Sequence, residues 1–291
     1  MKNTKSIYLV DDNEDDIMLI REALQSVITD VKITEISDGQ HLLDLVSLKA
    51  SDSPALILMD MCMPRVGGIE AVTSLKSNPD TTHIPVVMLS TCSDQRLIQG
   101  AYDEGVSAFI TKPIKPIEYK VMAEAINVCF LNSYVCNETI DIIDSFKDKS
   151  VLVIEDSKQH SELMNFAFKR HIPDLQIIYK NSKTETLNFL TENWFALPHP
   201  PDLILLDLYL PNRQDGLSLL DSIRYFFLFH GTPIVPVVIL SASDHIEDIK
   251  ASYEHNANAY IVKSIDIHES ISYFKSLFHF WCNTISVPKP T

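Results

Sequence analysis

The chain has 291 residues, 46% of them hydrophobic and 22% charged, and a formal net charge of −15 at neutral pH. This length and composition are typical of a soluble globular protein with two domains, each large enough for its own core. The acidic balance argues against nucleic-acid binding, which needs a basic stripe, and no apolar run is long enough to span a membrane.

Short, continuous apolar runs alternate with longer amphipathic stretches through the first half of the chain. Such runs are expected in strands of a parallel sheet, whose faces are both covered by the connecting helices. The expected strands are 6–10, 31–36, 55–60, 84–90 and 107–111. The expected helices are 13–27, 39–50, 68–77, 94–105 and 116–131.

The second half repeats this alternation. Its expected strands are 150–154, 175–180, 202–207, 235–240 and 258–262. Its expected helices are 157–170, 183–193, 215–229, 244–255 and 266–282. Strict alternation with connections of this length implies a doubly wound five-stranded parallel sheet with right-handed crossovers in each half.

The domain boundaries follow from these elements. We expect a first domain over 1–132 and a second over 149–285. The segment 133–148 between them is a linker whose apolar residues also have helical spacing. The last residues, 286–291, include two prolines and are expected to be frayed.

The same kinds of polar residue end the apolar runs, in the same order, in both halves. In the first half they are Asp11 and Asp12, Asp60, Ser90 and Lys112. In the second half they are Glu155 and Asp156, Asp207, Ser241 and Lys263. The serine and the lysine are 22 residues apart in both halves. An internal repeat this long indicates two copies of one domain, and polar residues at strand ends indicate chemistry rather than packing.

The residue types predict a phosphoryl site in each copy. Ligands bind outside the carboxyl ends of the strands in doubly wound sheets, and these residues all fall there. Clustered carboxylates repel one another and need a cation, and a set of oxygen ligands suits Mg²⁺. A divalent ion, an ammonium and a hydroxyl around one carboxylate would stabilise a phosphoryl group carried as an aspartyl phosphate.

Both halves resemble the receiver domains of two-component response regulators. The matching motifs are LVDDNEDD, LILMDMCMPRVGG, VVMLST and FITKP in the first half, and VLVIEDS, LILLDLYLPNRQDG, VVILSAS and YIVKS in the second. The second copy, with AYIVK and FHFW, is particularly similar to the small regulators that pair with bacterial phytochrome-type kinases. The resemblance implies two flavodoxin-like (CheY-like) domains in tandem.

The resemblance also implies the role of each site residue. Asp60 and Asp207 would accept phosphate from a histidine kinase or a histidine phosphotransfer protein. The Mg²⁺ ligands would be Asp60 and Asp207 themselves, Asp12 and Asp156 directly, Asp11 and Glu155 through water, and the backbone carbonyls of Cys62 and Tyr209. Ser90 and Ser241 would move to the phosphoryl oxygen beside Lys112 and Lys263, and Phe109 and Tyr260 would be the switch aromatics.

Some features depart from the family pattern. The family's aspartate is missing from MPRVGG, and LPNRQDG is one residue longer than usual. Lys112 is followed by Pro113, a bond that is often cis in the family, whereas Lys263 is followed by Ser264. The second copy is therefore the candidate for an alternative function, a binding or dimerisation module that is not phosphorylated.

The residues also argue against a hydrolytic enzyme that uses the same kind of aspartate. A phosphatase of the haloacid-dehalogenase type needs an acid two residues after its aspartate, but Cys62 and Tyr209 stand there. The chain is thus expected to catalyse only its own phosphorylation and dephosphorylation, with output through protein contact. The ten histidines, including His160, show no metal spacing and are expected to be structural.

Two further expectations concern the cellular compartment of the protein and a surface through which it makes contacts. The five cysteines form no C-x-x-C pair and no apolar signal core opens the chain, which indicates the cytoplasm. The last helix carries a second apolar stripe, Tyr273, Leu277 and Phe280, beyond the one that faces the sheet. We expect this stripe to contact the other domain or a second copy of the chain.

Overall fold

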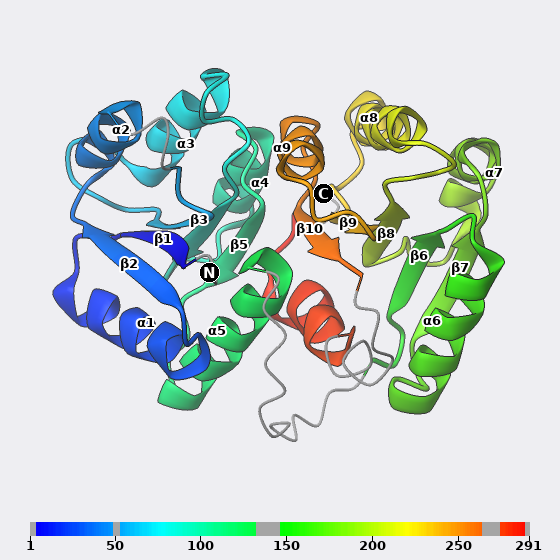
Figure 1. Cartoon of the computed structure of the whole chain (residues 1–291), viewed down its shortest axis with the longest axis horizontal. Helices are drawn as coiled ribbons and strands as arrows, with labels where there is room; N and C mark the ends of the chain where they lie inside the picture. The colour runs from blue at the N-terminus through cyan, green and yellow to red at the C-terminus, as the bar shows by residue number, and fades with distance from the viewer. Residues whose placement is uncertain (1–3, 49–52, 132–145, 264–273, 289–291) are drawn as a thin grey trace. The chain divides into compact units, whose positions relative to one another are not determined.

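The computed structural model describes residues 4–48, 53–131, 146–263 and 274–288. The chain divides into two compact units (Figure 1). The first contains Met1–Val135 and Thr284–Lys289, and the second contains Cys136–Asn283. Residues Thr284–Lys289 thus belong to the first unit although they follow the second unit in the sequence.

The first unit is a five-stranded parallel sheet with a helix after each strand. Its strands are β1 (Lys5–Val10), β2 (Val31–Ile36), β3 (Leu56–Asp60), β4 (Val86–Ser90) and β5 (Ala108–Thr111). Its helices are α1 (Glu14–Val27), α2 (Gly39–Leu48), α3 (Gly68–Ser77), α4 (Gln95–Asp103) and α5 (Pro116–Leu131). The strand order is β2-β1-β3-β4-β5, so the winding reverses between β1 and β3.

The second unit repeats this architecture. Its strands are β6 (Ser150–Ile154), β7 (Gln176–Lys180), β8 (Leu203–Asp207), β9 (Val237–Ser241) and β10 (Ala259–Val262). Its helices are α6 (Lys158–His171), α7 (Lys183–Asn188), α8 (Arg213–His230) and α9 (Ile246–Glu254), with a further helical segment over 274–279. The strand order β7-β6-β8-β9-β10 matches that of the first unit, which confirms the predicted doubly wound fold.

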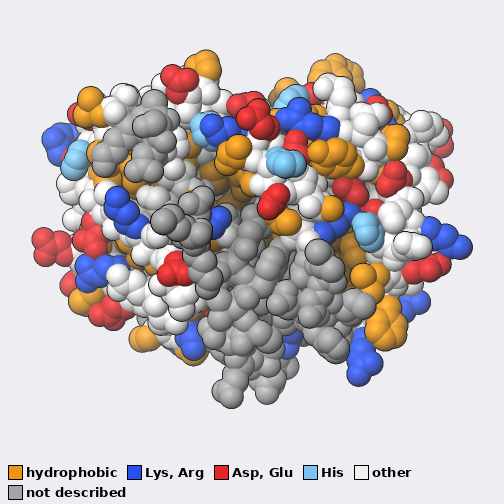
Figure 2. All heavy atoms as spheres, in the orientation of Figure 1, with side chains coloured by type: hydrophobic (Ala, Val, Ile, Leu, Met, Phe, Trp, Pro, Cys, Tyr) orange, Lys and Arg blue, Asp and Glu red, His pale blue; other side chains and the backbone are white. Residues whose placement is uncertain are grey.

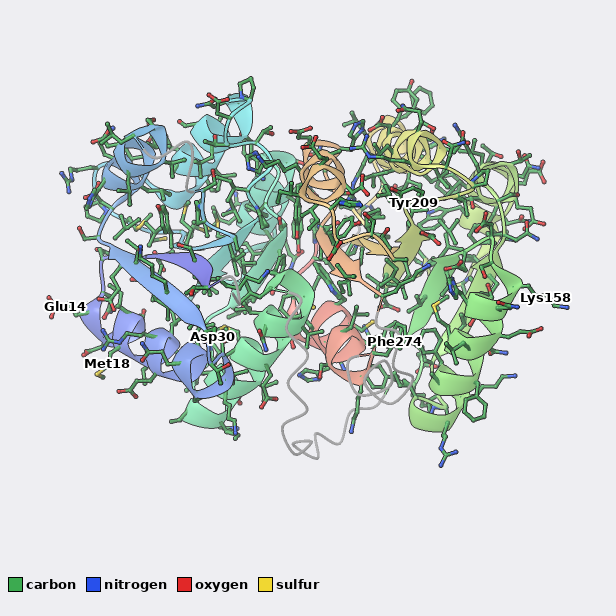
Figure 3. The ribbon with its side chains drawn as sticks, in the orientation of Figure 1. Glu14, Met18, Asp30, Lys158, Tyr209 and Phe274 are labelled. Atoms are coloured by element: carbon green, nitrogen blue, oxygen red, sulfur yellow. The ribbon has the colours of Figure 1, made fainter. Side chains whose placement is uncertain are left out.

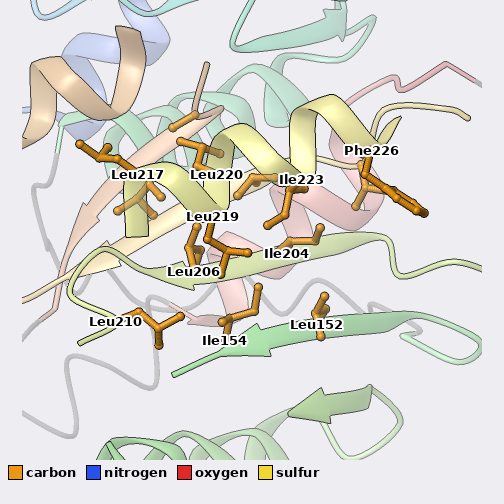
Figure 4. Packing of buried hydrophobic residues seen from close by; sticks show 14 of the residues in the cluster. Leu152, Ile154, Ile204, Leu206, Leu210, Leu217, Leu219, Leu220, Ile223 and Phe226 are labelled. Carbon is orange, nitrogen blue, oxygen red and sulfur yellow. The ribbon is translucent and has the colours of Figure 1, made fainter. Parts of the chain in front are cut away.

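Burial explains why the central strands read as continuous apolar runs. Every residue of β3, β4, β8 and β9 is buried, as expected when helices cover both faces of a sheet. In the second unit, leucine and isoleucine side chains of β6 and β8 pack under one face of α8 (Figure 4).

Two elements differ from the sequence-based expectation. The helix expected over 183–193 is α-helical only to Asn188 and continues as a π-helix, Phe189–Asn193, and a 3-10 turn, Trp194–Ala196. These wider and tighter turns bring Phe189, Leu190 and Trp194 together into the core. Helix α8 begins at Arg213, because the Asn212 side chain caps it by accepting from the Asp215 N–H. Residues 266–273 of the expected helix 266–282 lie outside the described residues.

The C-terminal residues are held against the first unit instead of being frayed over 286–288. The Ser286 N–H donates to the Phe109 carbonyl oxygen at 2.8 Å, and Ile285 forms an antiparallel bridge with Ile110. The Ser286 and Thr111 hydroxyls lie 3.3 Å apart. An edge strand presents unpaired backbone groups, and β5 is the edge strand that this segment covers.

The surface carries charged and apolar side chains together. Figure 2 shows acidic, basic and hydrophobic groups mixed over the visible face of the described residues. Among those residues, no helix combines the length and the apolar character that a membrane span requires. Leu277 and Phe280 of the predicted contact stripe are fully buried within the chain, and Tyr273 lies outside the described residues.

Candidate functional site

The carboxyl ends of the central strands bring the predicted residues of the first unit together. Asp11 follows β1, Asp60 ends β3 and Ser90 ends β4, while Lys112 follows β5. The four side chains come from positions far apart in sequence, yet all four are less than a tenth exposed. A parallel sheet places these ends at one edge, next to the point where its winding reverses.

Lys112 is the centre of the first site. Its ammonium lies 2.5 Å from Asp60 Oδ1 and donates to Asp11 Oδ2 and Asp16 Oδ2, both at 2.8 Å. The other Asp60 oxygen accepts from the Cys62 N–H at 2.6 Å. Asp12 is exposed at the rim of this cluster. One ammonium therefore holds three carboxylates, and the phosphoacceptor candidate lies in direct contact with it.

The second unit builds the same contact with fewer acids. The Lys263 ammonium donates to Glu155 Oε2 at 2.6 Å and to Asp207 Oδ2 at 2.7 Å. The Tyr209 N–H donates to Asp207 Oδ1 at 3.1 Å, as the Cys62 N–H does to Asp60. These groups line an open pocket of about 490 Å³ that also contains Asp156, Ser243 and His160.

Burial and ion pairing shift the pKa values of the site residues in opposite directions. Burial raises the pKa of Asp11, although the hydrogen bond from Lys112 opposes this, and burial likewise raises the pKa of Glu155. Burial alone would lower the pKa of Lys112, but its bonds to Asp11, Asp16 and Asp60 outweigh burial and raise it. The lysine therefore stays charged, while the buried acids gain from any further cation nearby.

The two serines and the two aromatics that the resemblance marks as switch residues lie inside the two units. Ser90 Oγ accepts from the Cys92 N–H at 3.1 Å, and Ser241 Oγ accepts from the Ser243 N–H at 3.2 Å. Phe109 and Tyr260 are almost fully buried. Burial raises the pKa of Tyr260 to about 12, so its hydroxyl remains a hydrogen-bond donor.

The donor set of the first site fits a hard divalent cation. Asp12 and Asp60 offer carboxylate oxygens at the ends of the paired strands β1 and β3, and the Cys62 carbonyl would add a third oxygen. In the second unit, ligand atoms of Glu155, His160 and Asp207 all lie within 4.8 Å of one another. That set contains a nitrogen, and it does not contain Asp156.

Two residues of these sites were missed by sequence reasoning. Asp16 is not among the predicted site residues, and His160 is expected to be structural. His160 Nδ1 instead lies 3.3 Å from Glu155 Oε1. Both residues stand five positions after the first acid of their copy, Asp11 or Glu155, and this shared spacing was the available signal.

The position of the cis peptide bond differs from the one that is usual in the family. The cis peptide bond found in the described part of the chain is Leu210–Pro211, and Lys112–Pro113 is not cis. The thiols of Cys62, Cys92 and Cys282 form no disulfide.

The sequence agrees with this geometry. A family model described as the response regulator receiver domain matches residues 7–124 and 151–275. These two ranges make up more than half of the chain. The chain therefore belongs to the response regulator receiver domain family, with two receivers in tandem, and the predicted resemblance is confirmed. Receiver domains are parts of two-component signalling systems, so the protein is of the two-component signalling class.

Individual relatives correspond to about half of this chain. The response regulator Rcp1 of Synechocystis sp. is 32% identical over 146 residues, which are 50% of this chain and 97% of Rcp1. The polar-differentiation response regulator DivK of Brucella ovis is 33% identical, over 38% of this chain and 86% of DivK. Among solved structures, the phosphorylated cyanobacterial phytochrome response regulator RcpA is 31% identical, with a TM-score of 0.42 over 48% of this chain and 99% of RcpA.

Proposed function

We propose that this protein is a response regulator with two phosphoacceptors, Asp60 and Asp207. A histidine kinase or a histidine phosphotransfer protein would supply the phosphoryl group. One observation carries the proposal. In each unit an aspartate at a strand end contacts a lysine ammonium, at 2.5 Å in the first unit and 2.7 Å in the second.

The chemistry would be a transfer between two side chains. A carboxylate oxygen of the aspartate attacks the phosphorus of a phosphohistidine, the phosphorus–nitrogen bond breaks, and the imidazole leaves with the electron pair. Lys112 or Lys263 stays charged and orients the aspartate and a phosphoryl oxygen. A bound Mg²⁺, held by Asp12, Asp60 and the Cys62 carbonyl in the first unit, would neutralise charge on the phosphoryl group.

The output would be a change in protein contact. Ser90 or Ser241 would move toward a phosphoryl oxygen, and Phe109 or Tyr260 would fill the space left behind. A histidine kinase or phosphotransfer protein is the upstream partner in this proposal, and the cytoplasm is its site of action. A second copy of the chain is a candidate downstream partner, because Tyr225, Leu228 and Phe229 form an exposed apolar surface on α8.

The alternative is that the second unit only binds, without accepting phosphate. Its longer loop and Ser264 are the features that favour this alternative. The contact between Asp207 and Lys263, and the pocket beside it, support the acceptor role in the second unit as well.

Mg²⁺ is expected to stabilise the protein and to be required for its phosphorylation. A ligand that binds only the folded state at 100 times its Kd adds about 2.7 kcal/mol. Thermal melting should therefore rise with Mg²⁺ over EDTA in the wild type, and rise less in Asp12→Ala and Asp156→Ala. Mass gain from a small phosphodonor should need the ion. Equal melting and equal mass gain in EDTA and in Mg²⁺ would reject the metal site.

A further inference from the structure

A histidine stands beside the carboxylates of the second site. His160 is in the first turn of α6, two residues after Lys158 (Figure 3), and its backbone N–H donates to the Ser157 hydroxyl oxygen that caps the helix. Its ring Nδ1 lies 3.3 Å from Glu155 Oε1. Because α6 begins soon after β6 ends, its first turn brings an imidazole to the carboxyl end of the sheet.

Lys263 takes one oxygen from each buried acid of this site. Its ammonium donates to Glu155 Oε2 and to Asp207 Oδ2. The other oxygen of the glutamate, Oε1, accepts from the Ser157 N–H at 3.2 Å. The other oxygen of the aspartate, Oδ1, accepts from the Tyr209 N–H at 3.1 Å. A carboxylate oxygen has two lone pairs, so each of these two oxygens can still bind a cation.

The ligand atoms of this site are close enough to hold one ion. Ligand atoms of Glu155, His160 and Asp207 all lie within 4.8 Å of one another. Both acids are less than a tenth exposed, while the side chain of the histidine is half exposed and can turn toward them without disturbing the core. The three residues line the open pocket beside Lys263, so an ion can reach them from solvent.

The first unit has an acid at the corresponding position. Asp16 occupies the place that His160 has in the second unit, five residues after the first acid of the copy. Its Oδ2 accepts from the Lys112 ammonium at 2.8 Å, so the lysine already engages this acid. The two copies therefore share the phosphoacceptor candidate and the lysine, but they differ in the donor atom beside the first acid.

The type of donor atom decides which ion such a site prefers. Mg²⁺ takes oxygen ligands and keeps several waters, whereas an imidazole nitrogen suits Zn²⁺, Ni²⁺ and other first-row transition ions. We propose that the second unit binds a divalent transition-metal ion through Glu155, His160 and Asp207, and selects it over Mg²⁺ far more strongly than the first unit does. This names the ion of the second site, and it rests on the proposed function only for the role of that ion in phosphate transfer.

The test measures Ni²⁺ binding to the full chain by isothermal titration calorimetry, with Mg²⁺ in excess to fill the first site. Ni²⁺ is the probe because the exposed thiols of Cys62 and Cys92 would bind Zn²⁺. His160→Gln removes the nitrogen ligand, and His160→Asp gives the second unit the acid that the first unit has. His245→Gln is the matched control, because His245 lines the same pocket but is not one of the three clustered ligands.

Ni²⁺ binding should weaken about 10- to 100-fold in both His160 variants, since losing even a supporting partner of a metal ligand costs this much affinity. His245→Gln should bind Ni²⁺ as the wild type does, and Mg²⁺ titrated alone should bind His160→Asp at least as well as the wild type. Tryptophan fluorescence in urea checks that each variant is folded. A loss of less than tenfold in the His160 variants, or an equal loss in His245→Gln, overturns the proposal.

The phosphoacceptor role of Asp207 is measured separately, by mass gain in the full chain carrying Asp60→Asn. Ni²⁺ binding that depends on His160, in a chain whose Asp207 gains no phosphate, would reject the proposed function at this site and support the metal site. Phosphate gain on Asp207 without that dependence would overturn the metal site alone.

Discussion

Gly216→Ala is expected to destabilise the second unit by about 3 kcal/mol, the upper end for overpacked interiors. A Cβ at Gly216 would lie 1.9 Å from the Leu208 carbonyl oxygen and 2.7 Å from its carbon. Both are backbone atoms next to Asp207, so they cannot rotate away, and α8 would have to move. Both tryptophans, Trp194 and Trp281, belong to the second unit, so their fluorescence reports its unfolding in urea.

Gly100→Ala is the control for this substitution. A Cβ at Gly100 meets nothing within 4 Å, and the residue lies within α4 of the first unit. Alanine in a helix is favoured over glycine by about 0.5–1 kcal/mol, so a small gain in stability is expected. A tryptophan transition in Gly216→Ala that coincides with the wild type would contradict the close approach of α8 to the end of β8.

Lys112→Met is expected to lower the free energy of unfolding of the first unit by about 3–5 kcal/mol in EDTA, the cost of leaving buried charges unpaired. Asp11 and Asp60 would lose their counter-ion while remaining buried. Mg²⁺ should recover part of the loss, because it supplies positive charge to the same carboxylates. Circular dichroism in urea measures both units, and tryptophan fluorescence should show the second unit unchanged.

The pH dependence of this variant follows from the buried acid. Burial raises the folded-state pKa of Asp11 above its unfolded value, and losing Lys112 removes the bond that opposes this shift. The folded state then binds the proton more tightly, so the variant should regain stability as the pH falls through the raised pKa. Lys115→Met, which removes an exposed lysine, should behave as the wild type. Equal losses in both variants would argue against a special role for Lys112.

The ends of the strands could be predicted because each end is marked in the sequence. Asp60, Ser90, Asp207 and Ser241 end strands in the structure as they end apolar runs in the sequence. A parallel sheet then requires these ends to meet, so the core of both sites follows from the fold class.

The remaining site residues depend on the directions of side chains. Asp16 and His160 both lie in early helical turns, where an acid or a polar residue is ordinarily explained by the helix itself. Only the three-dimensional structure shows that Asp16 contacts Lys112 and that His160 lies beside Glu155. The pairing of Ser286 with β5 is likewise a contact between distant positions, with no local signal.

Both units are expected to accept phosphate on the aspartate that contacts the lysine. The most direct test is the intact mass of four proteins after exposure to a small phosphodonor and Mg²⁺. The wild type should gain two phosphoryl groups, Asp60→Asn and Asp207→Asn one each, and the double variant none. A double variant that still gains phosphate, or a wild type that gains none, would contradict the account.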